Sequence, residues 1–217
     1  MSTTNIRTAP EQRRGRYILA SRPLMGWRTV DLLTIAFLGA AFGVAYWGWG
    51  ILYNGPLSAI QFAFAPLGGL FAGTWFMAGV VGGLVVRRPG AALLCEVLAA
   101  LVSMLPGTEW GATVLVSGIV QGLGCELVFA LFGYSFFGPL VAVLAGAMAG
   151  PFAAAYESTT WIQDWSLGWK LAYAGVLAFS GAVVAGLGGW ALTRTLAAAG
   201  ALNAFPAGQE AREHHAV

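Results

Sequence analysis

Six stretches of mostly apolar residues follow one another along the chain, each near the length that a helix needs to cross a lipid bilayer. About 20 apolar residues in a helix span the hydrocarbon core. Hydrophobic residues make up 58% of the 217 residues and charged residues 9%, whereas a soluble domain carries roughly 25% charged residues. We therefore predict an all-α integral membrane protein with a six-helix bundle. The predicted spans are residues 31–53, 68–86, 91–105, 111–132, 135–156 and 170–192.

The distribution of basic residues predicts the orientation of this bundle. Six of the eleven lie within residues 1–30, a polar segment without the apolar core of a signal peptide. With six spans, the turn at Arg87 and Arg88 and the tail 197–217 fall on that same side. Positively charged loops face the cytoplasm, so we expect both termini there, flanking a domain of residues 31–196 in the cell membrane. We expect no nucleic-acid partner.

The segment between the first two spans, residues 54–67, is apolar but interrupted by Pro56 and Pro66. Proline lacks a backbone donor and breaks regular helix. The sequence is compatible with an outer loop or with a re-entrant segment, and it does not distinguish between them.

Polar residues inside the predicted spans are the strongest indication of function. Glu96 lies in the third span, and Gln121 and Glu126 lie in the fourth. An ionisable group at that depth costs about 2.5–3.5 kcal/mol or more unless it is paired or solvated. No basic residue lies in the interior of a span, so we predict that these residues bind a cationic or hydrogen-bond-donating ligand. The alternative is a structural role, with each acid protonated or the two sharing a proton.

The depth of Glu126 leaves its role open. It lies about 22 Å along its helix from the predicted outer end, at 1.5 Å per residue. It is therefore expected either to contact the ligand or to support the pocket from below.

Two Cys-Glu pairs, Cys95-Glu96 and Cys125-Glu126, resemble metal ligands only superficially. Adjacent helical residues point about 100° apart, and one helix presents both poorly to one ion. The predicted spans also contain no histidine, which removes most schemes for metal-assisted or serine–histidine catalysis. We expect no metal, no cofactor and no catalytic residue, and a protein that is not an enzyme.

Aromatic residues gather towards the predicted outer face. An interfacial belt explains most of them. The alternative is that some form the walls of an outer pocket and stack on a flat ligand. The candidate walls are Trp47, Tyr53, Trp75 and Trp110.

Small residues recur at intervals of four in the first span. Such spacing lets helix backbones approach closely, either inside the bundle or against a separate membrane subunit. The sequence does not separate these uses. The pairs are Ala36 and Ala40, Gly39 and Gly43, and Ala41 and Ala45.

Three stretches resemble one known family. The run Arg-Arg-Pro-Gly-Ala-Ala-Leu at 87–93 leads to Glu96, and the run Val-Gln-Gly-Leu-Gly at 120–124 leads to Glu126. Gly200, Leu202 and Asn203 follow near the end. With the spacing of the spans, these runs resemble the YkoE family, over about residues 28–210. Its members are substrate-binding (S) components of energy-coupling-factor (ECF) transporters for thiamine or its hydroxymethylpyrimidine precursor.

The resemblance implies a six-helix S component that takes its vitamin from outside. It also implies a transmembrane coupling (T) subunit and two ATPase subunits as partners, and a gating role for the loop at 54–67. Small residues on the first helix would meet the coupling subunit, and those that match are Ala36, Ala40, Ala41 and Ala45.

The polar residues predicted within the spans suit the ligand that this resemblance implies. Thiamine carries a fixed positive charge and an aminopyrimidine ring, which suit an unpaired carboxylate and an amide. A competing hypothesis is a secondary transporter that moves a small cationic metabolite and is coupled to protons through Glu96 or Glu126.

Overall fold

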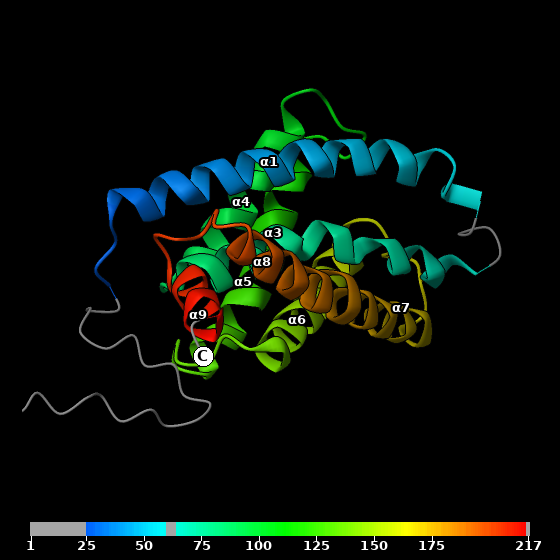
Figure 1. Ribbon diagram of the computed structural model, residues 1–217. Coiled ribbons are helices and arrows are strands. Elements are labelled where there is room, and N and C mark those ends of the chain that lie inside the picture. The colour runs from blue at the N-terminus through cyan, green and yellow to red at the C-terminus, as the bar shows by residue number, and fades with distance from the viewer. Residues whose placement is uncertain (1–24, 60–63, 216–217) are drawn as a thin grey trace, which may run out of the picture.

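The computed structural model describes residues 25–59 and 64–215, and its regular elements are helical throughout (Figure 1). Two of them depart from α geometry: η1 is a 3-10 helix and η2 is a π-helix. The elements are α1 (Thr29–Asn54), η1 (Ala65–Phe76), α3 (Met77–Val86), α4 (Ala91–Met104), α5 (Thr113–Leu131), α6 (Pro139–Thr160), α7 (Leu167–Ser180), η2 (Gly181–Gly188), α8 (Gly189–Ala198) and α9 (Pro206–His215).

Within the described residues, five helices are long and apolar enough to cross a membrane, and α4 is a shorter apolar helix. The second crossing joins η1 to α3 over Ala65–Val86, and the last runs without a break over Leu167–Ala198. With 14 residues, α4 is about 21 Å long at 1.5 Å per residue, against a hydrocarbon core of about 30 Å. The prediction of an all-α, six-helix membrane fold is confirmed.

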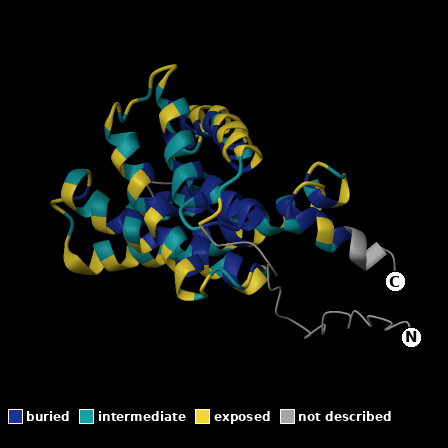
Figure 2. Cartoon of the chain, turned by 90° about the vertical axis from the view of Figure 1, so that its left-hand side faces the viewer, coloured by how far each residue is buried: buried dark blue, intermediate teal, exposed yellow. Residues whose placement is uncertain are grey.

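Apolar side chains cover the outside of the bundle as well as its interior. Phe37 on α1 is 74% exposed and Leu131 on α5 is 72% exposed. Figure 2 shows exposed residues along the outer faces of the helices and buried residues at the centre. Large exposed apolar faces are costly in water and are expected where a helix meets lipid. The long span Ala65–Val86 is the most enclosed, with 72% of its apolar window buried.

One end of the bundle is held together by ion pairs. The Arg28 guanidinium bonds to the Asp31 carboxylate at the start of α1, with Nη2 and Oδ1 2.5 Å apart. Arg88 Nε lies 4.0 Å from Asp31 Oδ2. Arg87 pairs with Glu210 of α9 through both guanidinium nitrogens. These contacts join the start of α1, the α3–α4 turn and α9.

The predicted tail, residues 197–217, is partly helical. Its described residues include the end of α8 and the whole of α9. Leu202, Phe205, Ala207 and Ala211 are buried in one apolar cluster with residues of α1, α3, α4 and α8. Figure 1 shows α9 beside the end of α8. This helix gives Arg87 its acidic partner.

The segment 54–67 is divided between elements. Asn54 ends α1, residues 65–67 begin η1, and residues 60–63 lie outside the described part of the chain. A gating role for this segment remains a prediction.

Candidate ligand-binding site

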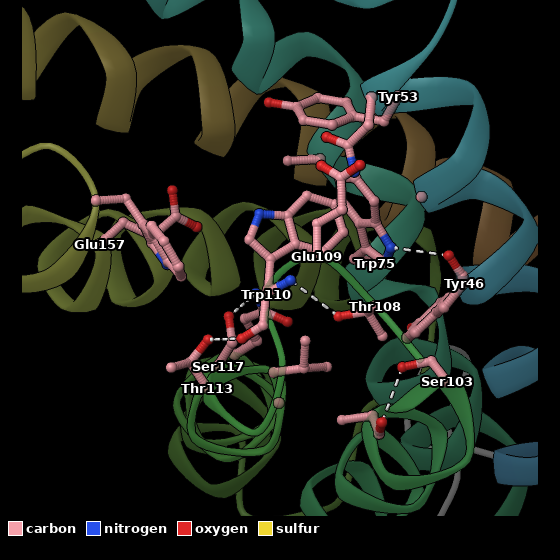
Figure 3. A pocket seen from close by; sticks show the side chains of 18 of the residues that line it. Tyr46, Tyr53, Trp75, Ser103, Thr108, Glu109, Trp110, Thr113, Ser117 and Glu157 are labelled. Atoms are coloured by element: carbon pink, nitrogen blue, oxygen red, sulfur yellow. Dashed lines mark hydrogen bonds between the residues drawn. The ribbon is translucent and has the colours of Figure 1, made fainter. Parts of the chain in front are cut away.

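A cavity of about 640 Å³ opens among α1, η1, α4, α5, α6 and α7 (Figure 3). Its size falls within the range of small-molecule sites. Six residues predicted to contact substrate lie on its wall: Glu96, Gln121, Trp47, Tyr53, Trp75 and Trp110. The structure thus brings together side chains from α1, η1, α4, the α4–α5 loop and α5, while their role as ligand contacts remains a prediction.

Glu96 is the most deeply enclosed acid of the cavity, with 1% of its surface exposed. Its Oε2 accepts hydrogen bonds from the Tyr46 hydroxyl at 3.1 Å and from the Gly79 backbone N–H at 2.7 Å. The Tyr46 hydroxyl in turn accepts from the Ala78 N–H at 2.8 Å. The other oxygen, Oε1, is buried and has no hydrogen-bond partner among the described residues.

The start of α3 explains why the Glu96 carboxylate is held there. The first N–H groups of an α-helix have no partner within the helix and favour negative charge. Gly79 lets the carboxylate come close, because a Cβ at this position would lie 3.2 Å from Glu96 Oε2 and 3.1 Å from Cys125 Sγ. One oxygen is therefore fixed by the protein, and the other is left for a donor.

Gln121 lies on α5, one side of the same cavity. Its Nε2 donates to Ser117 Oγ at 2.8 Å, and 8% of the residue is exposed. Ser103 of α4 also lines the cavity and donates to the Ala100 carbonyl at 2.8 Å. These groups add hydrogen-bonding capacity beside Glu96.

Three of the predicted aromatic walls contact one another. The Tyr53 ring centroid lies 5.0 Å from that of Trp75 and 6.0 Å from that of Trp110, and the two tryptophans are 5.5 Å apart. Trp75 Nε1 also donates to the Tyr46 carbonyl at 3.3 Å. In Figure 3, this aromatic group occupies the centre of the view. The two pairs that involve Trp75 are edge-on and the Tyr53–Trp110 pair is tilted, and such ring pairs stabilise packing.

Several polar residues that were not predicted from the sequence also line the cavity, among them Tyr46, Glu109, Glu157 and Tyr173. A signal for Tyr46 was present, because it shares a helical face with Gly39, Gly43 and Gly50, and all four are buried. No such signal identifies Glu157 or Tyr173, since they meet only when α6 packs on α7.

The cavity wall is acidic. Glu96, Glu109 and Glu157 line it, and no lysine, arginine or histidine stands among the described lining residues. Arg87 and Arg88 lie near Glu210 and Asp31 instead. A cationic ligand suits such a wall on electrostatic grounds.

Glu126 does not line the cavity. Its carboxylate accepts backbone hydrogen bonds from Gly90, Ala92 and Leu93 at 2.6–3.1 Å. The Tyr134 hydroxyl adds a fourth at 2.6 Å. Glu126 therefore caps the N-terminus of α4 from α5, which is a structural position.

The small residues of α1 separate into two faces. Gly39 and Gly43 are buried against α4, where a Cβ on Gly43 would lie 2.5 Å from Val102 Cβ and 2.8 Å from the Ala99 carbonyl oxygen. The four alanines predicted to dock a subunit, Ala36, Ala40, Ala41 and Ala45, are all exposed. Internal packing uses the glycines, and the alanines lie on the outer side of α1, where Phe37 and Val44 are also exposed.

Two free thiols lie inside the bundle, at Cys95 and Cys125. Among the described residues, no group of three or more His, Cys, Asp and Glu side chains is arranged to hold a metal ion.

Comparisons with known proteins show which family the chain belongs to. Residues 30–152, more than half of the chain, match a family described as the permease component of an ABC-type cobalt transport system. The protein YkoE of Bacillus subtilis (strain 168), whose name assigns it as an HMP/thiamine permease protein, is 32% identical over 192 residues. That alignment covers 88% of this chain and 94% of the relative. The chain belongs to the YkoE family.

A solved structure agrees with this assignment. A crystal structure of an S component of an ECF transporter superimposes on this YkoE-family chain with a TM-score of 0.81 and 31% sequence identity. The match covers 88% of this chain and 95% of the solved one. This YkoE-family protein is thus a multi-pass membrane protein and an S component of ECF type, and it is not an enzyme. The resemblance stated from the motifs is confirmed.

Proposed function

We propose that this S component captures thiamine or its hydroxymethylpyrimidine precursor in the cavity around Glu96. The observation that carries the proposal is the buried Glu96 Oε1, which lies without a hydrogen-bond partner among the described residues in a cavity that they line with three acids and no base. A buried polar atom left unpaired costs about 1–3 kcal/mol. A donor on the ligand would recover that free energy.

Thiamine and its precursor match the cavity in shape and chemistry. The aminopyrimidine ring carries N–H donors for Glu96 and both donor and acceptor groups for Gln121. Trp75, Trp110 and Tyr53 offer faces for flat rings, and the thiazolium of thiamine suits both aromatic faces and carboxylates.

The proposed direction of uptake follows from the two ends of the bundle. Arg28, Arg87 and Arg88 gather at the end where α9 lies. The cavity is lined by residues near the C-terminal ends of α1 and α6, such as Tyr53 and Glu157, whereas Arg28 lies at the N-terminal end of α1. Because positive charge favours the cytoplasmic side, the cavity would open outward and both termini would lie inside.

Delivery across the membrane would need partners. We propose that the transmembrane coupling subunit docks on the outer side of α1, where Ala36, Ala40, Ala41 and Ala45 are exposed. Two ATPases would then drive the complex. Small residues let a partner helix approach closely in lipid, where packing supplies much of the association free energy.

Titration of the purified protein tests ligand capture. Tryptophan fluorescence is followed while thiamine, or hydroxymethylpyrimidine, is added to the wild type and to Glu96→Gln. The wild type should show saturable quenching. The dissociation constant should rise by roughly tenfold or more in Glu96→Gln, as expected for loss of a charge-assisted hydrogen bond. No response of the wild type to either compound would refute the proposal.

Reconstitution separates the S component from a proton-coupled carrier. The chain alone in vesicles should bind vitamin without sustained uptake. Uptake by the chain alone that an uncoupler abolishes would favour the carrier instead.

A further inference from the structure

Glu157 forms a second acidic contact point in the cavity, apart from Glu96. It lies near the end of α6, and its Oε2 accepts a hydrogen bond of 2.6 Å from the Tyr173 hydroxyl of α7. Both residues line the cavity. The Tyr173 ring also packs edge-on against Trp165, with centroids 5.7 Å apart. The carboxylate is therefore held in place by two helices and an aromatic neighbour.

The two acids are held by different elements of the cavity wall. Glu157 bonds to Tyr173 of α7, and Glu96 bonds to Tyr46 of α1 and to the start of α3. In Figure 3, Trp110 and Trp75 lie between Glu157 and Tyr46, and Glu109 is labelled between the two tryptophans. A ligand that contacts both Glu157 and Glu96 would place its flat parts against these rings.

No basic side chain that would neutralise Glu157 is found among the described residues of the cavity wall. Lys170 is the basic residue of α7, and its Nζ donates to the Gln163 carbonyl at 2.8 Å. Tyr173 supplies a single neutral donor, which orients the carboxylate without cancelling its charge.

The carboxylates of Glu96 and Glu157 differ in the kind of ligand group that each can bind. Glu96 presents one buried oxygen that has no hydrogen-bond partner within the described part of the chain, which calls for a directional N–H or O–H donor. Glu157 is half-buried and lines the cavity together with Trp161 and Trp165. A carboxylate in a cavity with aromatic walls suits a diffuse cation that has no hydrogen to donate, such as a quaternary ring nitrogen.

We propose that Glu157, positioned by Tyr173, contacts the positive charge of the ligand, while Glu96 contacts the hydrogen-bond donors at its other end. This inference rests on the proposed function and refines it. The site would then recognise thiamine at two points and hydroxymethylpyrimidine, which lacks the cationic ring, only at Glu96. The pair Glu157–Tyr173 sets the preference between the two compounds.

The test compares the dissociation constants of both compounds across variants of the full chain in detergent. Glu157→Gln should weaken thiamine binding by roughly tenfold or more, as expected for loss of a close charge contact, and leave hydroxymethylpyrimidine binding within about twofold. Glu96→Gln should weaken both. Asp164→Asn removes an exposed acid of the neighbouring α6–α7 loop and should change neither.

Two further variants separate charge from folding. Glu157→Asp keeps the charge and should retain more thiamine binding than Glu157→Gln. Tyr173→Phe removes the positioning hydroxyl and should weaken thiamine binding by a smaller factor, again with hydroxymethylpyrimidine binding retained. Retained binding of the precursor reports a folded cavity in each variant.

The outcomes distinguish this inference from the proposed function. If the wild type binds both compounds, and Glu157→Gln weakens both equally or neither, the inference is overturned and the proposed function stands. If Glu157→Gln does not fold, an unchanged ratio of the two constants in Glu157→Asp and Tyr173→Phe overturns the inference. No binding of either compound to the wild type overturns both.

Discussion

The hydroxyl of Tyr46 donates a hydrogen bond of 3.1 Å to Glu96 Oε2 and accepts one of 2.8 Å from the Ala78 N–H. A single side chain of α1 thereby connects the acid of α4 to the start of α3. Since Glu96 Oε1 has no partner among the described residues, this relay orients the carboxylate so that one oxygen is left towards the cavity.

Removing the Tyr46 hydroxyl should affect both stability and binding. Tyr46→Phe leaves the Ala78 N–H without its acceptor and Glu96 Oε2 with the Gly79 N–H as its remaining donor among the described residues, and it should lower the free energy of unfolding by about 1–3 kcal/mol. Ligand affinity should fall as well, because the Glu96 carboxylate is held less firmly. Thermal unfolding in detergent and fluorescence titration measure the two effects.

The matched control is Tyr134→Phe. It removes a comparable hydroxyl, which donates to Glu126 at 2.6 Å, from a residue that does not line the cavity. It should lower stability without changing affinity. Wild-type affinity in Tyr46→Phe would contradict the positioning role.

The fold was predictable because hydropathy and length determine where helices cross a membrane. The predicted span 31–53 corresponds to α1 (Thr29–Asn54), and 91–105 to α4 (Ala91–Met104). Other ends differ in both directions, because α5 (Thr113–Leu131) lies inside the predicted span 111–132 and α6 (Pro139–Thr160) begins and ends four residues later than the predicted 135–156. The last crossing extends through η2 to Ala198, beyond the predicted end at residue 192, because packing rather than hydropathy sets where it stops.

The site was predictable only in part. Glu96 and Gln121 stand out because polar groups are costly inside an apolar helix. The same argument selects Glu126, but its partners are backbone N–H groups of α4, which composition does not reveal. Glu157 went unnoticed because its significance depends on Tyr173, 16 residues away and on another helix.

Substitution by glutamine should affect stability at Glu126 and ligand affinity at Glu96. Glu126→Gln places an amide where three backbone N–H groups need acceptors, and it should lower the free energy of unfolding by about 1–3 kcal/mol with little change in affinity. Glu96→Gln removes a buried charge and should reduce affinity without such destabilisation. A loss of vitamin binding in a folded Glu126→Gln protein would argue against a purely structural position.

The exposed alanines of α1 should matter for assembly and not for ligand capture. Ala40→Trp places a bulky ring on the proposed docking face, and it should prevent co-purification with a coupling subunit and abolish uptake by the full complex. Vitamin binding by the isolated chain should persist, because Ala40 does not line the cavity.

A control substitution on another lipid-facing helix tests the specificity of this effect. Leu171 of α7 is 64% exposed, and Leu171→Trp should leave both assembly and uptake intact. Equal impairment by Ala40→Trp and Leu171→Trp would exclude a specific docking face on α1.

The pair Arg87–Glu210 should stabilise the end of the bundle that is remote from the cavity. Arg87 is 4% exposed, packs over the Phe137 ring with its guanidinium carbon 4.7 Å from the centroid, and ends α3 with a positive φ of 57°. Glu210→Gln leaves this buried cation with a neutral partner. Because the pair is partly accessible on the Glu210 side, we expect a loss of about 1–3 kcal/mol, less than for a fully buried pair.

Thermal unfolding and proteolysis of the C-terminal helix measure this loss. Glu210→Gln should unfold earlier and expose α9 to protease, whereas Gln209→Ala, at an adjacent exposed position, should behave as the wild type. Affinity for the vitamin should be unchanged in both, since neither residue lines the cavity. Unaltered unfolding and proteolysis in Glu210→Gln would mean that apolar packing of Phe205 and Ala211 alone holds α9 in place.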